Sequence, residues 1–268
     1  MKGIRRSHQM FIQCFMSRGF LDAKEVKHLY KSCCETFGDA YLADEEERRK
    51  LLLEFVLTIN NNLRQFHMEI KKGVSEEDGS NFYGLVNMSD NNITRLASDY
   101  TTNELELFKK IVEFIVVESA TGEIGSIEVV NLTEKLDRRM SKNDAENLIN
   151  RMEEDKWIRV KQGRISLGTR AILELEQYIL SVYPDSATIC NLCNKLCLKG
   201  QTCGSCDCKL HFHCASRLFR GQDEPKCPKA GCGEIWSHDI PNRDVTMRST
   251  AVEQEDRHSR TRKRKLRH

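Results

Sequence analysis

A dense cluster of cysteines toward the C-terminal end constrains this chain more than any other feature. The chain has 268 residues and 12 cysteines, and nine of these lie between Cys190 and Cys232, together with His211 and His213. In a reducing compartment such a cluster binds metal rather than forming disulfides. The segment has few large apolar residues, so metal must supply much of its folding free energy.

Eight residues of this segment form four pairs in the order C4HC3. In chain order the pairs are Cys190 and Cys193, Cys203 and Cys206, His211 and Cys214, and Cys227 and Cys232. A gap of two residues lets both side chains of a pair reach one ion from a tight turn, and four such ligands close a zinc tetrahedron. The spacing predicts two structural Zn²⁺ ions with no open catalytic position. Cys197, Cys208 and His213 break the spacing and are interpreted as packing or surface residues.

Two zinc folds share the C4HC3 order: the PHD finger, which reads histone tails, and a RING variant, which recruits a ubiquitin-conjugating enzyme. PHD fingers usually carry an aromatic residue two positions before the seventh ligand, where this chain has Pro225. RING domains place an apolar residue within the first pair and a proline after the seventh ligand, where Leu192 and Pro228 lie. The pattern favours a cross-braced RING variant. One ion then takes Cys190, Cys193, His211 and Cys214, and the other takes Cys203, Cys206, Cys227 and Cys232.

A RING domain supplies no acid, base or nucleophile, because it acts by holding the charged conjugating enzyme near a substrate lysine. No catalytic residue is therefore expected in this chain. The candidate docking surface for the conjugating enzyme consists of Leu192, Leu218, Phe219 and Pro228. The alternative is that Leu218 and Phe219 only pack the small zinc domain.

The chain before the cysteines is predicted to hold two winged-helix-like domains, 1–92 and 101–183, in which helices precede a β-hairpin. In the first, helical periodicity over 10–15 and 52–66 precedes strands at 67–72 and 82–87, separated by a polar loop. The expected fold class is thus mainly α with small β-hairpins, followed by the zinc domain at 188–240 and a disordered basic tail at 241–268.

The second block gives the sharper local predictions. Helices are expected over 105–115, 145–152 and 169–182, with Thr102 or Asn103 capping the first and Ser141 opening the second. A two-residue turn at Gln162-Gly163 sets the register of the hairpin between them: Val160 opposite Ile165, and Ile158 opposite Leu167.

Charge limits the partners that the chain can have. Lys and Arg number 42 against 40 Asp and Glu, so the net charge of +2 excludes bulk nucleic-acid binding. Residues 141–154 carry two basic and four acidic side chains, so direct DNA binding is expected to be weak or absent. The tail is basic, and its nuclear-localisation candidates are Arg262, Lys263, Arg264 and Lys265. The apolar runs are too short to span a membrane, so the chain is expected to be intracellular and soluble.

The order of these blocks resembles one family, the non-structural maintenance of chromosomes element one (non-SMC element one) subunits of the Smc five–six genome-maintenance complex. The resemblance covers residues 1–240 and is most specific over 189–228, with 236–241 beyond. It implies a nuclear, chromosome-associated RING-type E3 ubiquitin ligase subunit that acts in DNA repair by homologous recombination. It also implies a MAGE-type winged-helix partner and a kleisin partner. The MAGE-type partner is expected to bind the winged-helix blocks, because these offer far more surface than the small zinc domain.

Two departures from the family pattern bear on activity. The last ligand pair is C-x4-C instead of C-x2-C, with the small insert 229–231 between Cys227 and Cys232. Gly233 and Glu234 then stand where many active RING domains carry a basic residue that holds ubiquitin. The ligase activity is therefore predicted to be weak without a partner. The alternative is a non-catalytic, zinc-stabilised scaffold subunit of the same complex.

Overall fold

The computed structural model describes residues 3–88 and 100–239. The chain separates into two compact units, of which the first contains Met1–Ser75 and Ser80–Ala187. The second contains Glu76–Gly79 and Thr188–His268, so it joins part of an early loop to the cysteine-rich segment. The predicted class, mainly helical with small sheets, is confirmed. The candidates Arg262, Lys263, Arg264 and Lys265 lie outside the described residues.

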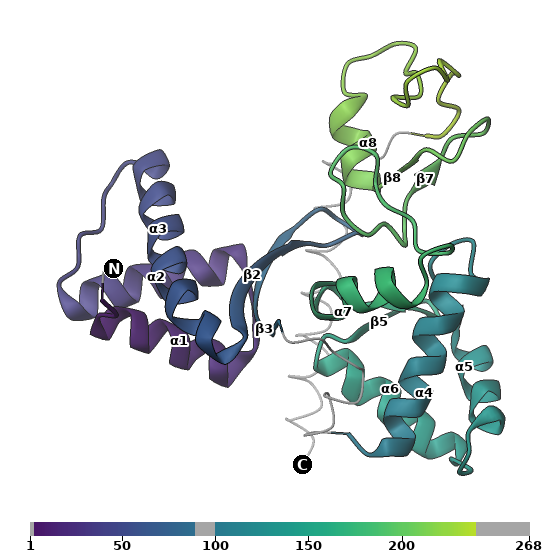
Figure 1. Cartoon of the computed structure of the whole chain (residues 1–268), viewed down its shortest axis with the longest axis horizontal. Helices are drawn as coiled ribbons and strands as arrows, with labels where there is room; N and C mark the ends of the chain where they lie inside the picture. Colours follow the sequence, from purple (N-terminus) through teal and green to yellow (C-terminus); the bar gives the residue numbers. More distant parts are fainter. Residues whose placement is uncertain (1–2, 89–99, 240–268) are drawn as a thin grey trace, which may run out of the picture. The chain divides into compact units, whose positions relative to one another are not determined.

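The N-terminal part of the first unit packs helices against an antiparallel sheet that includes β2 and β3 (Figure 1). The sheet has three strands in the order β1-β3-β2. Its elements are α1 (Arg6–Arg18), β1 (Phe20–Asp22), α2 (Ala23–Phe37), α3 (Glu45–Leu63), the turn η1 (Arg64–Phe66), β2 (Met68–Val74) and β3 (Asn81–Asn87). The expected hairpin is present, whereas α2 and β1 were not predicted. Aromatic rings form the core, with Phe55 in edge contact with Phe11 at 5.2 Å and Tyr30 at 5.1 Å between centroids.

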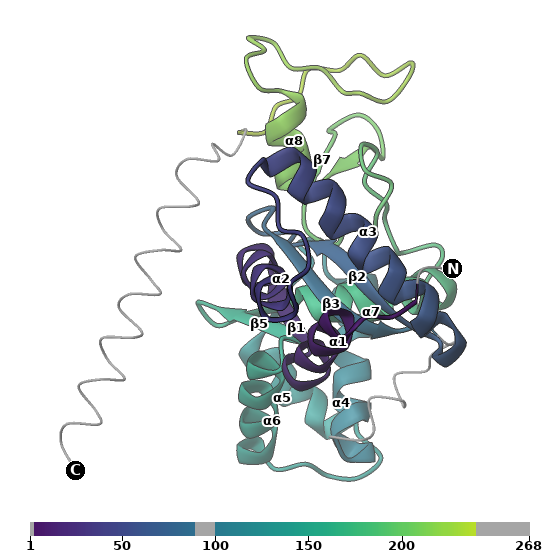
Figure 2. The same cartoon turned by 90° about the vertical axis from the view of Figure 1, so that its left-hand side faces the viewer.

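Asn60 connects α3 to β2, which pack against each other (Figure 2). Its side-chain amide donates to the Ile70 carbonyl at 3.1 Å and accepts from the Ile70 N–H at 2.9 Å. Asn60 is buried, so water cannot replace these two bonds. Asn60 therefore adds two buried hydrogen bonds to the apolar packing of the hairpin on α3.

Replacement of Asn60 by alanine is expected to lower the free energy of unfolding by about 2–3 kcal/mol, because it leaves a buried N–H and a buried carbonyl unpaired. Urea denaturation measures the loss. Asn61→Ala is the control, since Asn61 is exposed on the same helix and its replacement should change stability by about 0.5 kcal/mol or less. Equal stability of the two variants would contradict this role of Asn60.

The rest of the first unit holds a second helical part with its own sheet, in the order β4-β6-β5. Its elements are α4 (Thr102–Glu113), η3 (Phe114–Glu118), β4 (Ile124–Gly125), α5 (Ser126–Leu132), η4 (Thr133–Lys135), α6 (Lys142–Glu154), β5 (Ile158–Lys161), β6 (Arg164–Leu167) and α7 (Thr169–Val182). Buried Phe108 and Trp157 make an edge contact in its core, with centroids 6.0 Å apart.

The local predictions for this part hold in most details. The register of β5 and β6 pairs Val160 with Ile165 and Ile158 with Leu167, as expected. Gln162 and Gly163 both have positive φ, which is the backbone of the predicted two-residue turn. The cap of α4 differs, because the Thr101 hydroxyl, one residue earlier than predicted, accepts from the Glu104 N–H.

The helix α7 packs against β2 and β3 of the N-terminal hairpin. A Cβ at Gly73 would lie only 2.7 Å from the Leu173 side chain, so this glycine permits the close approach. Lys71 of β2 also lies 3.9 Å from Glu176 of α7. The two helical parts of the first unit therefore share an interface at this hairpin.

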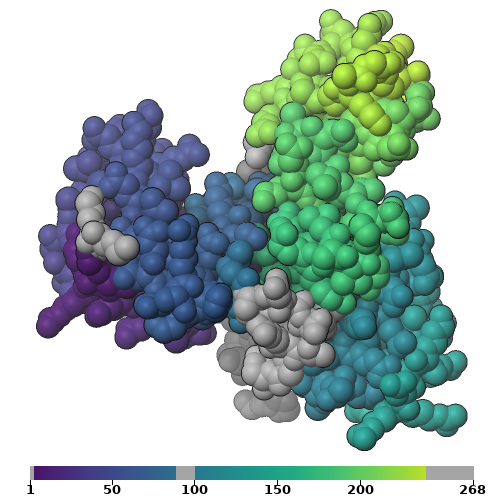
Figure 3. All heavy atoms as spheres, in the orientation of Figure 1, coloured from purple at the N-terminus to yellow at the C-terminus, as the bar shows by residue number. Residues whose placement is uncertain are grey.

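The second unit has little regular structure. It contains β7 (Gln201–Thr202), β8 (Lys209–Leu210) and α8 (Phe212–Leu218), with single bridges at Ile189–Leu196 and Lys226–Ile235. In space-filling view its atoms nevertheless gather in one body, coloured light green to yellow (Figure 3). Across the described ranges, no helix is both long and apolar enough to cross a membrane.

Candidate metal centre

The first group of predicted ligands converges at one point of the second unit. Cys190, Cys193, His211 and Cys214 each offer a ligand atom, and all these atoms lie within 4.8 Å of one another. His211 is the N-cap of α8 and Cys214 lies in its first turn, so a helical spacing of three places both on one side. The Ile189–Leu196 bridge closes the turn that carries the cysteine pair.

The remaining predicted ligands, Cys203, Cys206, Cys227 and Cys232, form a second group within the same limit of 4.8 Å. The first two lie between β7 and β8, and the last two lie beside the Lys226–Ile235 bridge. The longer gap before Cys232 forms a turn in which its N–H donates to the Lys229 carbonyl, with Gly231 at φ 81°. The insert therefore allows the side chains of Cys227 and Cys232 to point toward the same candidate metal site.

The spacing of the donor atoms fits a tetrahedral metal ion. Zinc lies about 2.3 Å from thiolate sulfur, which gives S···S edges of about 3.8 Å in a tetrahedron. The second group has Sγ···Sγ distances of 3.8 Å between Cys203 and Cys232 and 3.6 Å between Cys206 and Cys227. In the first group the His211 Nδ1 lies 3.4 Å from Cys193 Sγ. Each cluster can thus hold one metal ion with four N/S donors.

The electrostatics of each cluster favour at least one thiolate, which is the form that binds metal. A hydrogen bond from the Cys214 thiol holds the pKa of Cys190 well below its usual range, while the pKa of Cys214 is raised. In the second cluster, backbone N–H donors, first that of Ser205, lower the pKa of Cys203 to about 7. Each cluster therefore contains one cysteine whose surroundings favour the metal-binding thiolate.

Two further cysteines are buried beside the clusters. Cys197 and Cys208 are both fully buried but belong to neither group of four. Cys197 instead falls in a third combination, with His211 and Glu76, whose ligand atoms also lie within 4.8 Å of one another. No sequence pattern points to Glu76, because it lies in a polar loop far from the cysteines in the chain.

The structure corrects one member of the candidate docking surface. Phe219 is only 2% exposed and packs on Trp236, with ring centroids 5.2 Å apart, so it belongs to the core. Leu192 and Leu218 are half-buried against the ligand clusters, and Pro228 is exposed. The accessible members of the candidate docking surface are therefore Leu192, Leu218 and Pro228.

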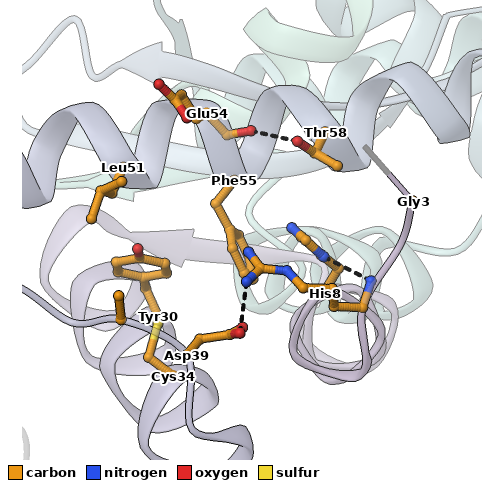
Figure 4. A pocket seen from close by; sticks show the side chains of 11 residues that line it. Gly3, His8, Tyr30, Cys34, Asp39, Leu51, Glu54, Phe55 and Thr58 are labelled. Carbon is orange, nitrogen blue, oxygen red and sulfur yellow. Dashed lines mark hydrogen bonds and ion pairs between the residues drawn. The ribbon is translucent and has the colours of Figure 1, made fainter. Parts of the chain in front are cut away.

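A separate hollow lies among α1, α2 and α3 in the first unit, with a volume of about 500 Å³ (Figure 4). The guanidinium of Arg5 pairs with Asp39 at 2.6 Å beside it. Burial raises the pKa of the Cys34 thiol and of the Tyr30 phenol, so both remain protonated near neutral pH. Neither group is therefore an activated nucleophile.

Comparison with known proteins agrees with this geometry. Residues 8–175 match the family described as "Nse1 non-SMC component of SMC5-6 complex", and residues 190–230 match a RING-like domain. A Xenopus tropicalis protein called "Non-structural maintenance of chromosomes element 1 homolog" is 42% identical over 89% of this chain and 86% of its own. The human protein of that name is 37% identical over 87% and 85%.

A solved chain of an "Nse1-Nse3-Nse4 complex" has a similar fold. Its TM-score is 0.79 at 41% sequence identity, and the match covers 90% of this chain and 100% of that one.

Proposed function

Because the chain belongs to the family of the Nse1 non-SMC component of the SMC5-6 complex, we propose that it is the RING-type ubiquitin ligase subunit of such a complex. The observation that carries this proposal is the pair of interleaved four-donor clusters within a RING-like segment. Interleaving fixes the loops around both clusters in one body, on which a conjugating enzyme can dock.

Two Zn²⁺ ions are the proposed occupants of the clusters. The first is held by Cys190, Cys193, His211 and Cys214, and the second by Cys203, Cys206, Cys227 and Cys232. When bound, zinc supplies folding free energy and no reaction chemistry, since each cluster has four protein donors and no open position. The proposed roles of zinc and of the clusters are therefore structural.

Ubiquitin transfer needs no acid, base or nucleophile from this chain. The amine of a substrate lysine attacks the thioester carbonyl of the charged conjugating enzyme, an isopeptide bond forms, and the enzyme's cysteine thiol leaves. The chain contributes position, through a docking surface of Leu192, Leu218 and Pro228. Gly233 stands where a basic residue would hold the ubiquitin, so few orientations of the bound ubiquitin are productive and activity is weak without a partner.

A MAGE-type subunit and a kleisin subunit are the proposed partners, since the similar solved chain is part of an Nse1-Nse3-Nse4 complex. The helical blocks 1–92 and 101–183, proposed as winged-helix-like domains, are assigned as the binding region for the MAGE-type subunit. A stable interface buries about 1,200–2,000 Å². The first unit also exposes large apolar side chains: Met16, Leu53, Leu57 and Ile127.

The proposed setting is nuclear, in repair by homologous recombination, with at most weak direct DNA contact.

Reconstitution of the full chain with its two partners tests the proposal. Autoubiquitination with a panel of conjugating enzymes is expected to be weak for the chain alone and to rise in the complex. A chain that ends at Pro184 should retain the MAGE-type subunit in a pull-down but lose activity. Loss of that subunit would move the interface to the zinc domain.

A scaffold without activity is the second candidate, favoured by Gly233 and Glu234 after the last ligand. It predicts that the complete complex, with both metal sites filled, is inactive with every conjugating enzyme. It also predicts that changes at Leu192 have no effect on ubiquitin transfer.

A further inference from the structure

The loop between β2 and β3 brings a carboxylate to the edge of the first ligand cluster. The Glu76 Oε1 lies 3.2 Å from the His211 Nε2 and accepts a hydrogen bond from the Leu198 N–H at 2.8 Å. The side chains of Glu76 and His211 are only 5% and 4% exposed. Burial of a charged carboxylate costs free energy unless it has such partners. The two partners of Glu76 therefore account for its burial in the second unit.

The two ring nitrogens of His211 face different surroundings. Nδ1 lies 3.4 Å from Cys193 Sγ and 3.8 Å from Cys214 Sγ, so it faces the ligand cluster. Nε2 lies 2.9 Å from the Leu196 carbonyl and beside the Glu76 carboxylate, both of which are acceptors. A histidine that binds metal through Nδ1 must carry its proton on Nε2. The surroundings of His211 favour that tautomer.

We propose that Glu76 is a positioning residue for His211, so that a loop of the N-terminal hairpin completes the outer shell of the first metal site. The inference rests on the metal-binding role proposed above. A carboxylate that accepts from the imidazole N–H holds the ring in place and makes Nδ1 a better donor. Outer partners of this kind change metal affinity by about 10–100-fold.

Direct ligation by Glu76 is the competing interpretation, because Glu76, Cys197 and His211 also lie within 4.8 Å of one another. His211 Nδ1 faces the cysteines of the first cluster, which already provides four donors. Four donors close a structural zinc site. Glu76 therefore acts on the metal through His211 and does not touch it.

Metal release from the full chain tests the proposal. Glu76→Gln keeps the size of the side chain but removes its charge, and a colorimetric chelator follows the loss of zinc with time. One ion is expected to leave about tenfold faster than in the wild type, and the other at the wild-type rate. Glu77→Gln is the matched control, since Glu77 lies in the same loop but pairs with Lys199. It should leave both rates unchanged.

Three outcomes have different meanings. Wild-type release of both ions from Glu76→Gln would overturn the proposal while leaving the metal sites intact. Faster release of both ions would also overturn it, because it would show general destabilisation of the unit. A wild-type chain that binds no metal would instead refute the proposed function.

Replacement of zinc by Co²⁺ gives a second measurement. The Co²⁺ absorption bands would not shift on replacement of Glu76 if its role were merely structural. The first cluster offers three sulfurs and one nitrogen and the second four sulfurs, so their Co²⁺ absorption bands differ. Glu76→Gln should shift only the bands of the first site, and Cys197→Ser should leave them in place. Loss of these bands in Cys197→Ser would mean that Glu76, Cys197 and His211 bind the ion directly, and would overturn the proposal.

Discussion

Replacement of Cys214 by serine is expected to remove metal from the first cluster and to unfold the second unit. The metal content should fall from two ions per chain to one or fewer. The segment from Thr188 onward should also lose its resistance to proteases. The effect is large because structural zinc supplies about 10–16 kcal/mol of apparent binding free energy in small zinc domains, and three donors cannot close the tetrahedron.

Cys197→Ser is the matched control for this experiment. Cys197 and Cys214 are both buried, at 0% and 1% exposure, but only Cys214 belongs to a group of four candidate ligands. The control variant should retain two ions and a folded segment. If Cys197→Ser loses metal while Cys214→Ser keeps it, the ligand assignment is wrong.

Leu192→Ala is expected to reduce ubiquitin transfer by the complete complex more than about tenfold, because truncation of a central apolar anchor costs about 2 kcal/mol or more at an interface. Leu192 lies between the first two candidate ligands and is half-buried, so the variant should keep both ions. Single-turnover discharge of a charged conjugating enzyme measures the loss, and metal content verifies that the unit is intact.

Ile235→Ala controls for the loss of apolar surface in the same unit. Ile235 is 58% exposed but lies outside the proposed docking surface, so its replacement should leave the discharge rate unchanged. Equal rates for wild type and Leu192→Ala would refute the docking surface and favour the scaffold. Loss of activity in both variants would show that the assay responds to the fold of the unit.

Features that depend on neighbours in the chain could be predicted from the sequence. The register of β5 and β6 follows from the two-residue turn at Gln162-Gly163. This turn pairs Val160 with Ile165 and Ile158 with Leu167, so that all four apolar side chains lie on one face of the sheet. The grouping of the eight candidate ligands follows from the cross-braced RING pattern, and the structure brings each group of four within 4.8 Å.

Features that depend on distant contacts were missed. The helix α2 buries Val26, Tyr30, Cys33 and Cys34. Half of these buried residues are cysteines, which conceals the helical pattern in the sequence. The burial of Phe219 depends on Trp236, across the loops that carry the last ligand pair. The role of Glu76 is the extreme case, because no periodicity or spacing relates a polar loop to a histidine on another segment.

The discontinuous second unit has a consequence for synthesis of the chain on the ribosome. Glu76 and its partner Leu198 are 122 positions apart, which corresponds to about 6–24 s at 5–20 residues per second. During this interval the loop Glu76–Gly79 lacks its partners, and its acidic side chains are exposed to water. We expect nascent or prematurely terminated chains that lack Cys190 and the residues beyond it to be cut by proteases at this loop, a liability that only the finished chain removes.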